Sequence, residues 1–247
     1  MNLLQKIDEA KKQIDTYRPL EGHMLKELKE YYRIGLTYTS NALEGNTLTE
    51  SETKVVLEEG ITIAGKPLKD HLEALGHSEA YDFIFQCMHG HSFSEEEIKR
   101  LHYLFYHKIS EREAGMYRTK QVFISGSQYP VPTPDKIEQL MSDFIARQTE
   151  LKQRYHPVEY AALVHKEFVF IHPFIDGNGR VARLLMNLVF LQEGYTIAVI
   201  PPVVRAQYIQ ALERAHVDDR PFIDFIAQRV YETQKDYLRL LGAEQAS

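Results

Sequence analysis

One loop and the helix that follows it carry the residues most able to do chemistry. The stretch from Ile171 to Asn187 reads IHPFIDGNGRVARLLMN. It places the imidazole of His172 four positions before the carboxylate of Asp176, on the same loop. Histidine titrates near neutral pH and a carboxylate is a hard oxygen ligand, so the loop offers a proton acceptor beside a ligand for a divalent cation.

Two guanidinium groups follow directly, at the start of a helix predicted over residues 180–192. Apolar residues cover most of the circumference of this helix, which is typical of a helix buried at the centre of a domain. Spacings of three and four residues put Arg180, Arg183 and Asn187 on a single stripe. Cations at a helix start oppose the macrodipole by roughly 0.3–1 kcal/mol each, so we expect an anion to meet the arginines. The Gly-Asn-Gly sequence at 177–179 lets consecutive backbone amides turn towards one point, which predicts a phosphate-sized site.

A simpler interpretation of the same residues exists. An Asp-Gly-Asn-Gly turn can cap a helix whose arginines pair with ordinary carboxylates, and for an isolated turn of this kind that interpretation would be preferred. Here His172 and Asp176 lie on the same loop as the turn. A base, a carboxylate and a phosphate site together favour the chemistry of a magnesium nucleotide.

The twelve residues from His172 to Arg183, HPFIDGNGRVAR, resemble at every defined position the active-site signature of Fic-domain proteins. The resemblance covers nearly the whole chain, firmly at two motifs and loosely between them. Members of this family typically transfer AMP from ATP to a hydroxyl side chain of a target protein. The resemblance implies a mainly α fold, a Fic-type helical domain with a small β-hairpin flap near the active site.

The resemblance also implies a role for each motif residue. His172 would be the general base that takes the proton of the incoming hydroxyl, Asp176 would be the Mg²⁺ ligand, and Phe174 would anchor the loop. The nucleotide-binding positions would be the phosphate-surrounding residues Gly177, Asn178 and Gly179 and the β- and γ-phosphate arginines Arg180 and Arg183. Gly179 stands where the related Doc-type kinases carry a lysine, which favours nucleotidyl transfer over phosphoryl transfer.

A helix predicted at 204–215 is expected, by analogy with the family, to wall the adenine pocket. Tyr208 is the candidate residue for that contact. A tyrosine packed in the core is an equally good interpretation of this position.

A second motif lies far upstream of the first. The stretch from Ser40 to Asn46 reads SNALEGN and puts Glu44 at the end of a helix, where the dipole disfavours a carboxylate. A solvated glutamate is the simplest explanation. The stretch also resembles the inhibitory motif of Fic proteins, in which the glutamate pairs with the second motif arginine, here Arg183. The resemblance implies inhibition in cis, because Glu44 would compete with the γ-phosphate for Arg183, and in such relatives the same side chain can position water for removal of AMP.

Residues 121–130 contain β-favouring side chains around Gly126 and predict a hairpin. Its position matches the flap of the family, which docks a target segment by strand addition. The docking residues would be Val122, Phe123 and Ile124. The alternative is a hairpin that simply folds onto the core.

The resemblance implies a single Fic-type domain, residues 1–247. Predicted helices end near residue 16, span 23–43, 49–59, 70–88, 134–151, 180–192, 204–215 and 221–241, and also start at residues 94 and 157. Thr49 with Glu52, and Ser94 with Glu97, are capping-box sequences. We expect residues 1–46 to be an N-terminal helical segment that carries the inhibitory motif, and residues 47–247 to be the catalytic core.

Composition limits the classes of function. The chain of 247 residues has a formal charge of −6 and no basic run, so nucleic acid is not an expected partner. The single cysteine, Cys87, cannot form a disulfide within the chain, and no uncharged apolar run reaches the ~18 residues of a membrane span. We therefore expect a cytoplasmic location without membrane association, and a homodimer is one assembly that the sequence allows.

Together these observations predict an autoinhibited protein adenylyltransferase. It would move AMP from ATP, with Mg²⁺, to a Ser, Thr or Tyr hydroxyl of a target protein docked at the flap, and to itself. Two alternatives remain open. A protein de-AMPylase would use the same site and need both His172 and Glu44. A non-enzymatic nucleotide-sensing interaction module is less favoured, because a sensor does not require a base at position 172.

Overall fold

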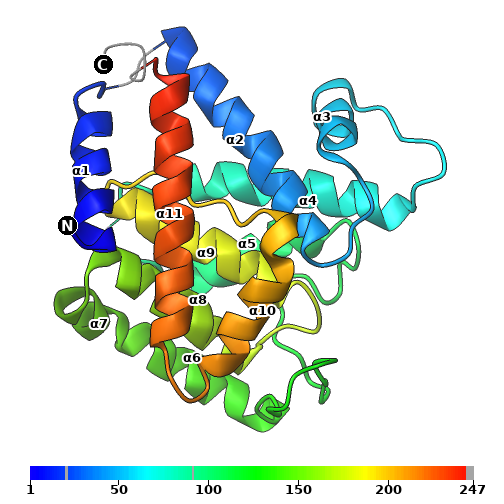
Figure 1. Cartoon of the computed structure of the whole chain (residues 1–247). Coiled ribbons are helices and arrows are strands. Elements are labelled where there is room, and N and C mark those ends of the chain that lie inside the picture. The colour runs from blue at the N-terminus through cyan, green and yellow to red at the C-terminus, as the bar shows by residue number, and fades with distance from the viewer. Residues whose placement is uncertain (20–21, 91, 243–247) are drawn as a thin grey trace.

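The computed structural model describes residues 1–19, 22–90 and 92–242, which fold into a mainly helical domain (Figure 1). The α-helices are α1 (Leu3–Asp15), α2 (Gly22–Ala42), α3 (Glu50–Glu59), α4 (Leu68–Gln86), α5 (Glu95–Tyr106), α6 (Ile137–Ala146), α7 (Gln148–Arg154), α8 (Pro157–Ile171), α9 (Asn178–Gln192), α10 (Arg205–Arg214) and α11 (Arg220–Leu240). Two short 3-10 helices, η1 (Pro134–Lys136) and η2 (Pro202–Val204), precede α6 and α10. The prediction of a mainly α fold is confirmed.

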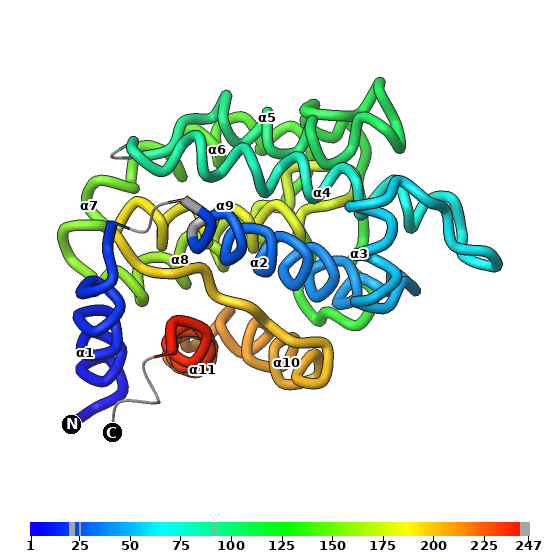
Figure 2. Tube along the Cα trace, turned by 90° about the horizontal axis from the view of Figure 1, so that it is seen from above, coloured from blue at the N-terminus to red at the C-terminus, as the bar shows by residue number. Residues whose placement is uncertain are grey.

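Helix α9 lies at the centre of the domain, as its apolar circumference predicts. All of its residues are buried except Gly179 and the last two. In the view from above, α8 and α9 lie between a layer that contains α5 and α6 and a layer that contains α10 and α11 (Figure 2). Each Leu, Val or Phe that α9 buries contributes about 1.5–3 kcal/mol, so the helix that carries both motif arginines is firmly fixed.

Local sequence signals explain several helix starts. Thr49 and Glu52 form the predicted capping box at α3, and Ser94 and Glu97 form the one at α5. Each box satisfies two backbone amides that have no partner within their own helix. Further capping boxes begin α1 and α8, so side chains hold the starts of these four helices in this way.

One predicted helix is interrupted. The region predicted as a single helix over 134–151 starts as the 3-10 helix η1 and breaks at Arg147, between α6 and α7. Next to this break, the side-chain amide of the buried Gln148 donates to the carbonyl of Phe144, at 2.5 Å. Periodicity alone does not show such a break, because the apolar positions on either side remain in phase.

The hairpin predicted for residues 121–130 is not formed. These residues contain no β-strand. Pro130 and Pro132 have no N–H to donate to a ladder, and the side-chain amide of Gln121 donates to the carbonyl of Val131 at 3.2 Å, where a paired strand would use its backbone. The segment is therefore a loop, and we refer to residues 119–133 as the 119–133 loop.

Elements from the two ends of the sequence lie side by side. Helix α1 packs along α11 in both views (Figures 1 and 2). Asp8 of α1 accepts a hydrogen bond from the Tyr195 hydroxyl at 2.7 Å, which connects α1 to the residues that follow α9. None of the helices in the described ranges combines the length and the apolar character that crossing a bilayer requires.

Candidate active site

The loop between α8 and α9 is held in an unusual backbone conformation at the candidate base. His172 ends α8 with φ 51° and ψ 57°, in the left-handed region, and its amide donates to the Phe168 carbonyl at 3.1 Å. Arg118 stabilises this conformation, because its Nε donates to the His172 carbonyl at 2.8 Å and its backbone amide donates to the Pro173 carbonyl at 2.9 Å. Arg118 is only 4% exposed, and its remaining contacts reach the 119–133 loop. A left-handed residue other than glycine at a site of this kind requires such support.

The tip of the loop is closed by an amide side chain. Asn178 accepts from the Phe174 amide at 2.9 Å and donates to the Phe174 carbonyl at 2.8 Å. The Phe174 ring is fully buried and stacks on His102, with centroids 3.8 Å apart and planes 4° apart. The predicted anchoring position of Phe174 agrees with this packing. The side chain of Asn178 is thus occupied, and only its backbone is free to face a ligand.

His102 of α5 also stabilises the motif loop, through hydrogen bonds that no sequence motif indicates. Its Nε2 donates to the Asp176 carbonyl at 3.1 Å, while its Nδ1 accepts from the Gly115 amide at 2.8 Å. Burial lowers the pKa of His102 to about 4, so the ring is neutral and these two bonds fix its tautomer. Its sequence position, within an apolar helix face, gives no signal of this role.

The candidate base is neutral at physiological pH. Burial, together with the nearby positive charge of Arg118, lowers the pKa of His172 to about 4. The Val169 carbonyl and the carboxylates of Glu44 and Asp176 oppose this shift without cancelling it. A neutral imidazole can accept a proton, which is the state that a general base requires.

Arg183 is paired with the upstream motif. Its Nη2 donates to Glu44 Oε1 at 2.8 Å and to the Ser40 carbonyl at 2.8 Å, and its Nε donates to Ser40 Oγ at 3.0 Å. The Arg183 side chain is 2% exposed, whereas the side chain of Glu44 is 35% exposed. Burial raises the pKa of Glu44, but Arg183 and Arg180 outweigh burial and hold the pKa below its usual value. The ion pair is therefore charged at neutral pH, and both residues of the upstream motif contact Arg183.

Gly179 makes room for this ion pair. A Cβ at Gly179 would collide with Glu44 Oε1 and would lie 3.2 Å from Arg183 Nη1. The carboxylate of Glu44 therefore lies against the first turn of α9, where backbone amides have no partner within the helix and the dipole attracts anions. The predicted anion site at this helix start is met here by a carboxylate of the same chain.

Arg180 has a different partner from Arg183, the carboxylate of Glu73, which no sequence motif indicates. Its Nη1 donates to Glu73 Oε1 of α4 at 2.8 Å, and its Nη2 donates to Asp176 Oδ1 at 3.1 Å. The side chains of Arg180 and Glu73 are 4% and 6% exposed. Glu73 Oε2 also accepts from Asn46 Nδ2 at 2.9 Å. Both motif arginines are thus paired with carboxylates in this structure, as the simpler interpretation of the motif held.

Asp176 keeps one carboxylate oxygen facing outward. Oδ1 accepts from the Gly177 amide at 2.6 Å and from Arg180, while Oδ2 accepts from Lys69 Nζ at 3.4 Å. Burial raises the pKa of Asp176, but Arg180, the Gly177 amide and Lys69 outweigh it, so the group is ionised. The described residues contain no cluster of three or more His, Cys, Asp or Glu suited to a metal. Asp176 alone fits a magnesium ion that takes its other ligands from phosphates and water.

Tyr208 lies beneath Arg183 and does not line an open pocket. It is 3% exposed, and its hydroxyl lies 3.3 Å from Arg183 Nη1 and 3.0 Å from His165 Nε2. His165 is fully buried, as expected for a structural histidine. Asn187, the third member of the predicted polar stripe, binds the backbone of Ala198 from both ends of its amide and lies outside the site.

The three candidate docking residues lie on the 119–133 loop. Phe123 is 87% exposed and Ile124 is 38% exposed, so their side chains do not fold onto the core. Val122 is partly exposed. Their role in docking a target protein therefore stays a prediction.

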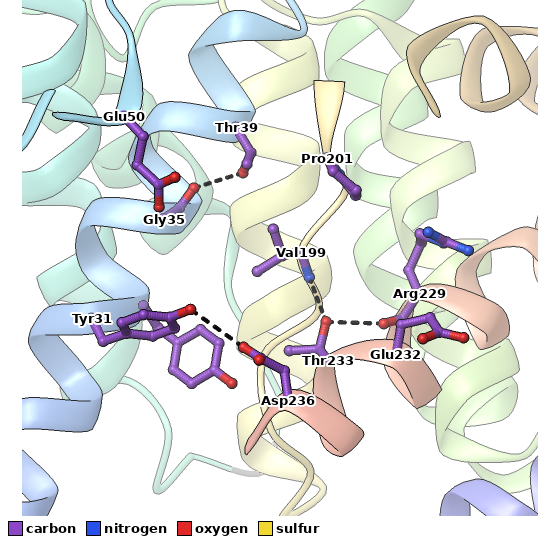
Figure 3. Close-up of a pocket in the computed structure, with 11 residues that line it drawn as sticks. Tyr31, Gly35, Thr39, Glu50, Val199, Pro201, Arg229, Glu232, Thr233 and Asp236 are labelled. Atoms are coloured by element: carbon purple, nitrogen blue, oxygen red, sulfur yellow. Dashed lines mark hydrogen bonds between the residues drawn. The ribbon is translucent and has the colours of Figure 1, made fainter. Parts of the chain in front are cut away.

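The structure contains one cavity that lies away from the motif loop and another that is lined by Phe170 and Ile171, directly before His172. One of about 220 Å³ separates α2 from α11, and the Tyr31 hydroxyl donates to Asp236 across it at 3.4 Å (Figure 3). On its floor, the amide of Val199 donates to Thr233 at 3.1 Å. The other, of about 620 Å³, is bounded by α6, α8 and Pro132 of the 119–133 loop. Helix α2, which leads into the upstream motif, is therefore incompletely packed against α11.

The chain is similar to known proteins in both sequence and structure. A model of the Fic/DOC family matches residues 92–190. "Protein adenylyltransferase Fic" of Nematostella vectensis is 36% identical over 243 residues, which are 96% of this chain and 56% of that protein. Fic-1 of C. elegans, solved for its residues 134–508, is 30% identical with a TM-score of 0.85, over 98% of this chain and 72% of that one. A Fic domain containing signaling protein from Bacteroides thetaiotaomicron is 26% identical with a TM-score of 0.88, over 100% and 98% of the two chains. The chain spans about half the length of the curated relatives it matches.

Proposed function

Because this chain belongs to the Fic family, we propose that it is a protein adenylyltransferase that holds itself inactive. The observation that carries the proposal is the pairing of Glu44 with Arg183, 2.8 Å apart, beside the loop that holds His172. Curated relatives of this chain are named protein adenylyltransferases, which supports the same reaction here. Residues 1–46 would be the regulatory segment and residues 47–247 the catalytic core of one domain.

The proposed reaction transfers AMP to a hydroxyl group of a protein. His172 takes the proton of a Ser, Thr or Tyr hydroxyl, the freed oxygen attacks the α-phosphorus of ATP, and the bond from that phosphorus to the β-phosphate oxygen breaks. The products are the AMP-modified protein, pyrophosphate and a proton. Magnesium, when held by Asp176, would neutralise charge on the phosphates.

Other motif residues would bind and orient the nucleotide. Arg183 and Arg180 supply positive charge to the β- and γ-phosphates, and the backbone of residues 177–179 lines the phosphates. Tyr208 would hold Arg183 in position, since its hydroxyl lies 3.3 Å from that guanidinium and the residue is almost fully buried. The target segment would dock on the 119–133 loop, at Val122, Phe123 and Ile124.

Inhibition follows from competition for one guanidinium. Glu44 occupies Arg183 Nη2 and lies against Gly179, where the γ-phosphate would otherwise bind. A charge-assisted hydrogen bond contributes about 1.5–3 kcal/mol, so the cost of displacing Glu44 would weaken productive ATP binding by roughly 10- to 150-fold. Arg205 also donates to the carbonyl of Leu43 at 2.7 Å and holds the motif in place.

The test measures transfer of labelled AMP from ATP in four forms of the chain. The Glu44→Gly chain should label itself or added protein at least tenfold faster than the parent. Adding His172→Ala to it should abolish labelling, and Glu58→Gly, on the exposed face of α3, should behave as the parent. Equal labelling of the parent and the Glu44→Gly chain would contradict autoinhibition. A Glu44→Gly chain that binds no ATP in the presence of magnesium would contradict the nucleotide site itself.

Removal of AMP is the second candidate activity. Glu44 is partly exposed and lies close to the proposed phosphate site, where its carboxylate can hold a water molecule. A parent chain that releases AMP from a pre-modified protein, and loses this activity on Glu44→Gly, would be a de-AMPylase. A nucleotide-sensing module would instead bind ATP without transfer, even after Glu44→Gly.

A further inference from the structure

We propose that Glu213 and His216, just beyond the site, are positioning residues that hold the 119–133 loop at a fixed place beside His172. The inference rests on the proposed function, because it assigns this loop to the docking of a protein substrate. Both residues lie at or just after the C-terminal end of α10, and neither belongs to the two motifs.

The two ends of the loop are already connected to His172, the candidate general base. Arg118 donates from Nη1 to the Lys120 carbonyl at 3.0 Å and from Nη2 to the Pro132 carbonyl at 2.6 Å. The same guanidinium donates from Nε to the His172 carbonyl at 2.8 Å. The two ends of the loop therefore cannot move independently of His172, whereas its tip, residues 125–129, needs a separate attachment.

Glu213 supplies the first attachment of the tip. Its carboxylate accepts from the Ser127 hydroxyl at 3.0 and 3.1 Å and from the Gln128 amide at 2.7 Å. No salt bridge joins Glu213 to a cation in the described part of the chain. Its charge is therefore directed at the loop, where it satisfies one side-chain hydroxyl and one backbone amide that no strand pairing satisfies.

His216 supplies the second attachment. Its ring is stacked between two others, with the Tyr129 centroid at 3.8 Å and 18° on one side and the Phe170 centroid at 3.7 Å and 6° on the other. Phe170 lies two residues before His172 on α8. The stack thus sets the distance between the tip of the loop and the end of α8 that carries the candidate base. Burial lowers the pKa of His216, which favours the neutral ring.

The attachments matter because the loop forms no β-ladder of its own. A segment without internal pairing would otherwise sample many conformations, and a substrate protein would have to order it on binding. Holding the loop in advance lowers that entropic cost. The expected consequence of losing Glu213 or His216 is a higher KM for the protein substrate, with little change in the KM for ATP.

The experiment compares variants in the Glu44→Gly background, with the His172→Ala chain as the protein substrate. Two variants remove the attachments, Glu213→Ala and His216→Ala. A third, His216→Phe, keeps the ring stack, and Glu58→Ala serves as a matched control on an exposed helix face. Hydrogen exchange at residues 121–131 and the initial rate of AMP transfer are measured at increasing substrate concentration, at a temperature where all variants remain folded by circular dichroism.

We expect about tenfold faster exchange at the loop tip and about a three- to tenfold higher KM for the protein substrate in both alanine variants, with kcat and the KM for ATP within about twofold. His216→Phe should restore the parent KM, which a loss of general stability would not explain. Unchanged exchange in the alanine variants, or faster exchange with an unchanged KM, overturns the positioning role. If the Glu44→Gly chain transfers no AMP to any acceptor, the proposed function fails, and the exchange measurement still decides whether the attachments exist.

Discussion

Glu44 Oε1 and Arg183 Nη2 lie 2.8 Å apart although 139 residues separate them along the chain. The contact joins the segment just after α2 to the second turn of α9, so the upstream motif and the active-site motif meet directly. An arginine at this depth, with 2% of its side chain exposed, requires an anionic partner. Glu44 provides that partner in this structure, and a triphosphate would provide it in the proposed active state.

Gly179→Ala tests the close contact between α9 and Glu44. The new Cβ would collide with Glu44 Oε1, so the substitution should destabilise the parent chain by about 1–3 kcal/mol. In the Glu44→Gly chain the same substitution should cost much less, because the colliding atom is gone. Urea unfolding of the four chains forms a double-mutant cycle. A coupling energy near zero would mean that Glu44 does not lie against Gly179 in solution.

Glu73→Ala tests the ion pair that the sequence analysis missed. Removing this carboxylate leaves the buried Arg180 with only Asp176, and breaking a buried pair in this way costs about 3–5 kcal/mol. Lys69→Ala is the control, because Lys69 contacts the same carboxylates from the surface with 55% of its side chain exposed. An exposed pair contributes about 0–1 kcal/mol, so the two variants should differ clearly in urea midpoint. Similar midpoints would show that Glu73 is not the main partner of Arg180.

The stability of the domain should fall below neutral pH because of buried histidines. Burial lowers the pKa of His77 and of His165 to about 3 each, from 6.5 in the unfolded chain. Below pH 6.5 the unfolded state takes up protons that the folded state does not, so stability is fully present above pH 6.5 and is lost as pH falls towards 3. Each histidine should contribute roughly 1 kcal/mol per pH unit in this window.

Urea unfolding between pH 7.5 and pH 5 measures this slope. His165→Gln removes one titrating group while leaving an amide to meet the Tyr208 hydroxyl. It should reduce the number of protons taken up on unfolding by about one, and so make the dependence of the unfolding free energy on pH shallower. A slope that does not change on this substitution would show that His165 is protonated in the folded state or is not buried.

The rate of AMP transfer should remain high at mildly acidic pH. Burial and the charge of Arg118 lower the pKa of His172 to about 4, so the imidazole remains neutral and able to accept a proton well below pH 6.5. The acid limb of kcat/KM for the Glu44→Gly chain should therefore lie nearer pH 4 than pH 6.5, within the range where the protein stays folded. Arg118→Gln removes the positive charge next to His172 and should move this limb to higher pH. An acid limb at pH 6.5 in both chains would contradict the buried position of the base.

Periodicity and capping signals predicted most of the fold. Helix α9, the ends of α2 and the capping boxes of α3 and α5 all follow from local patterns. The prediction of a hairpin was wrong because β-favouring side chains at 121–124 do not show whether a partner strand exists. The segment that would have to pair with them is rich in proline. The break between α6 and α7 was missed because the apolar positions on its two sides remain in phase.

The sequence identified the residues of the two motifs but not the residues that hold them. Glu73, His102 and Arg118 come from three separate segments, and each acts through a contact with the loop or with Arg180 that only the folded chain creates. A carboxylate or imidazole within an amphipathic helix has no local feature that distinguishes it from a solvated one. For Asn187 the sequence pattern was misleading in the other direction. It shares a helix face with the two arginines, but its side chain binds the backbone of Ala198 and takes no part in the site.

The absence of a side chain at position 179 has an implication for related sequences. If Glu44 can reach Arg183 only when nothing projects from residue 179, then homologues with any larger residue there cannot retain this closed arrangement. Lineages that replace this glycine should therefore also lose the upstream glutamate or acquire a separate inhibitor.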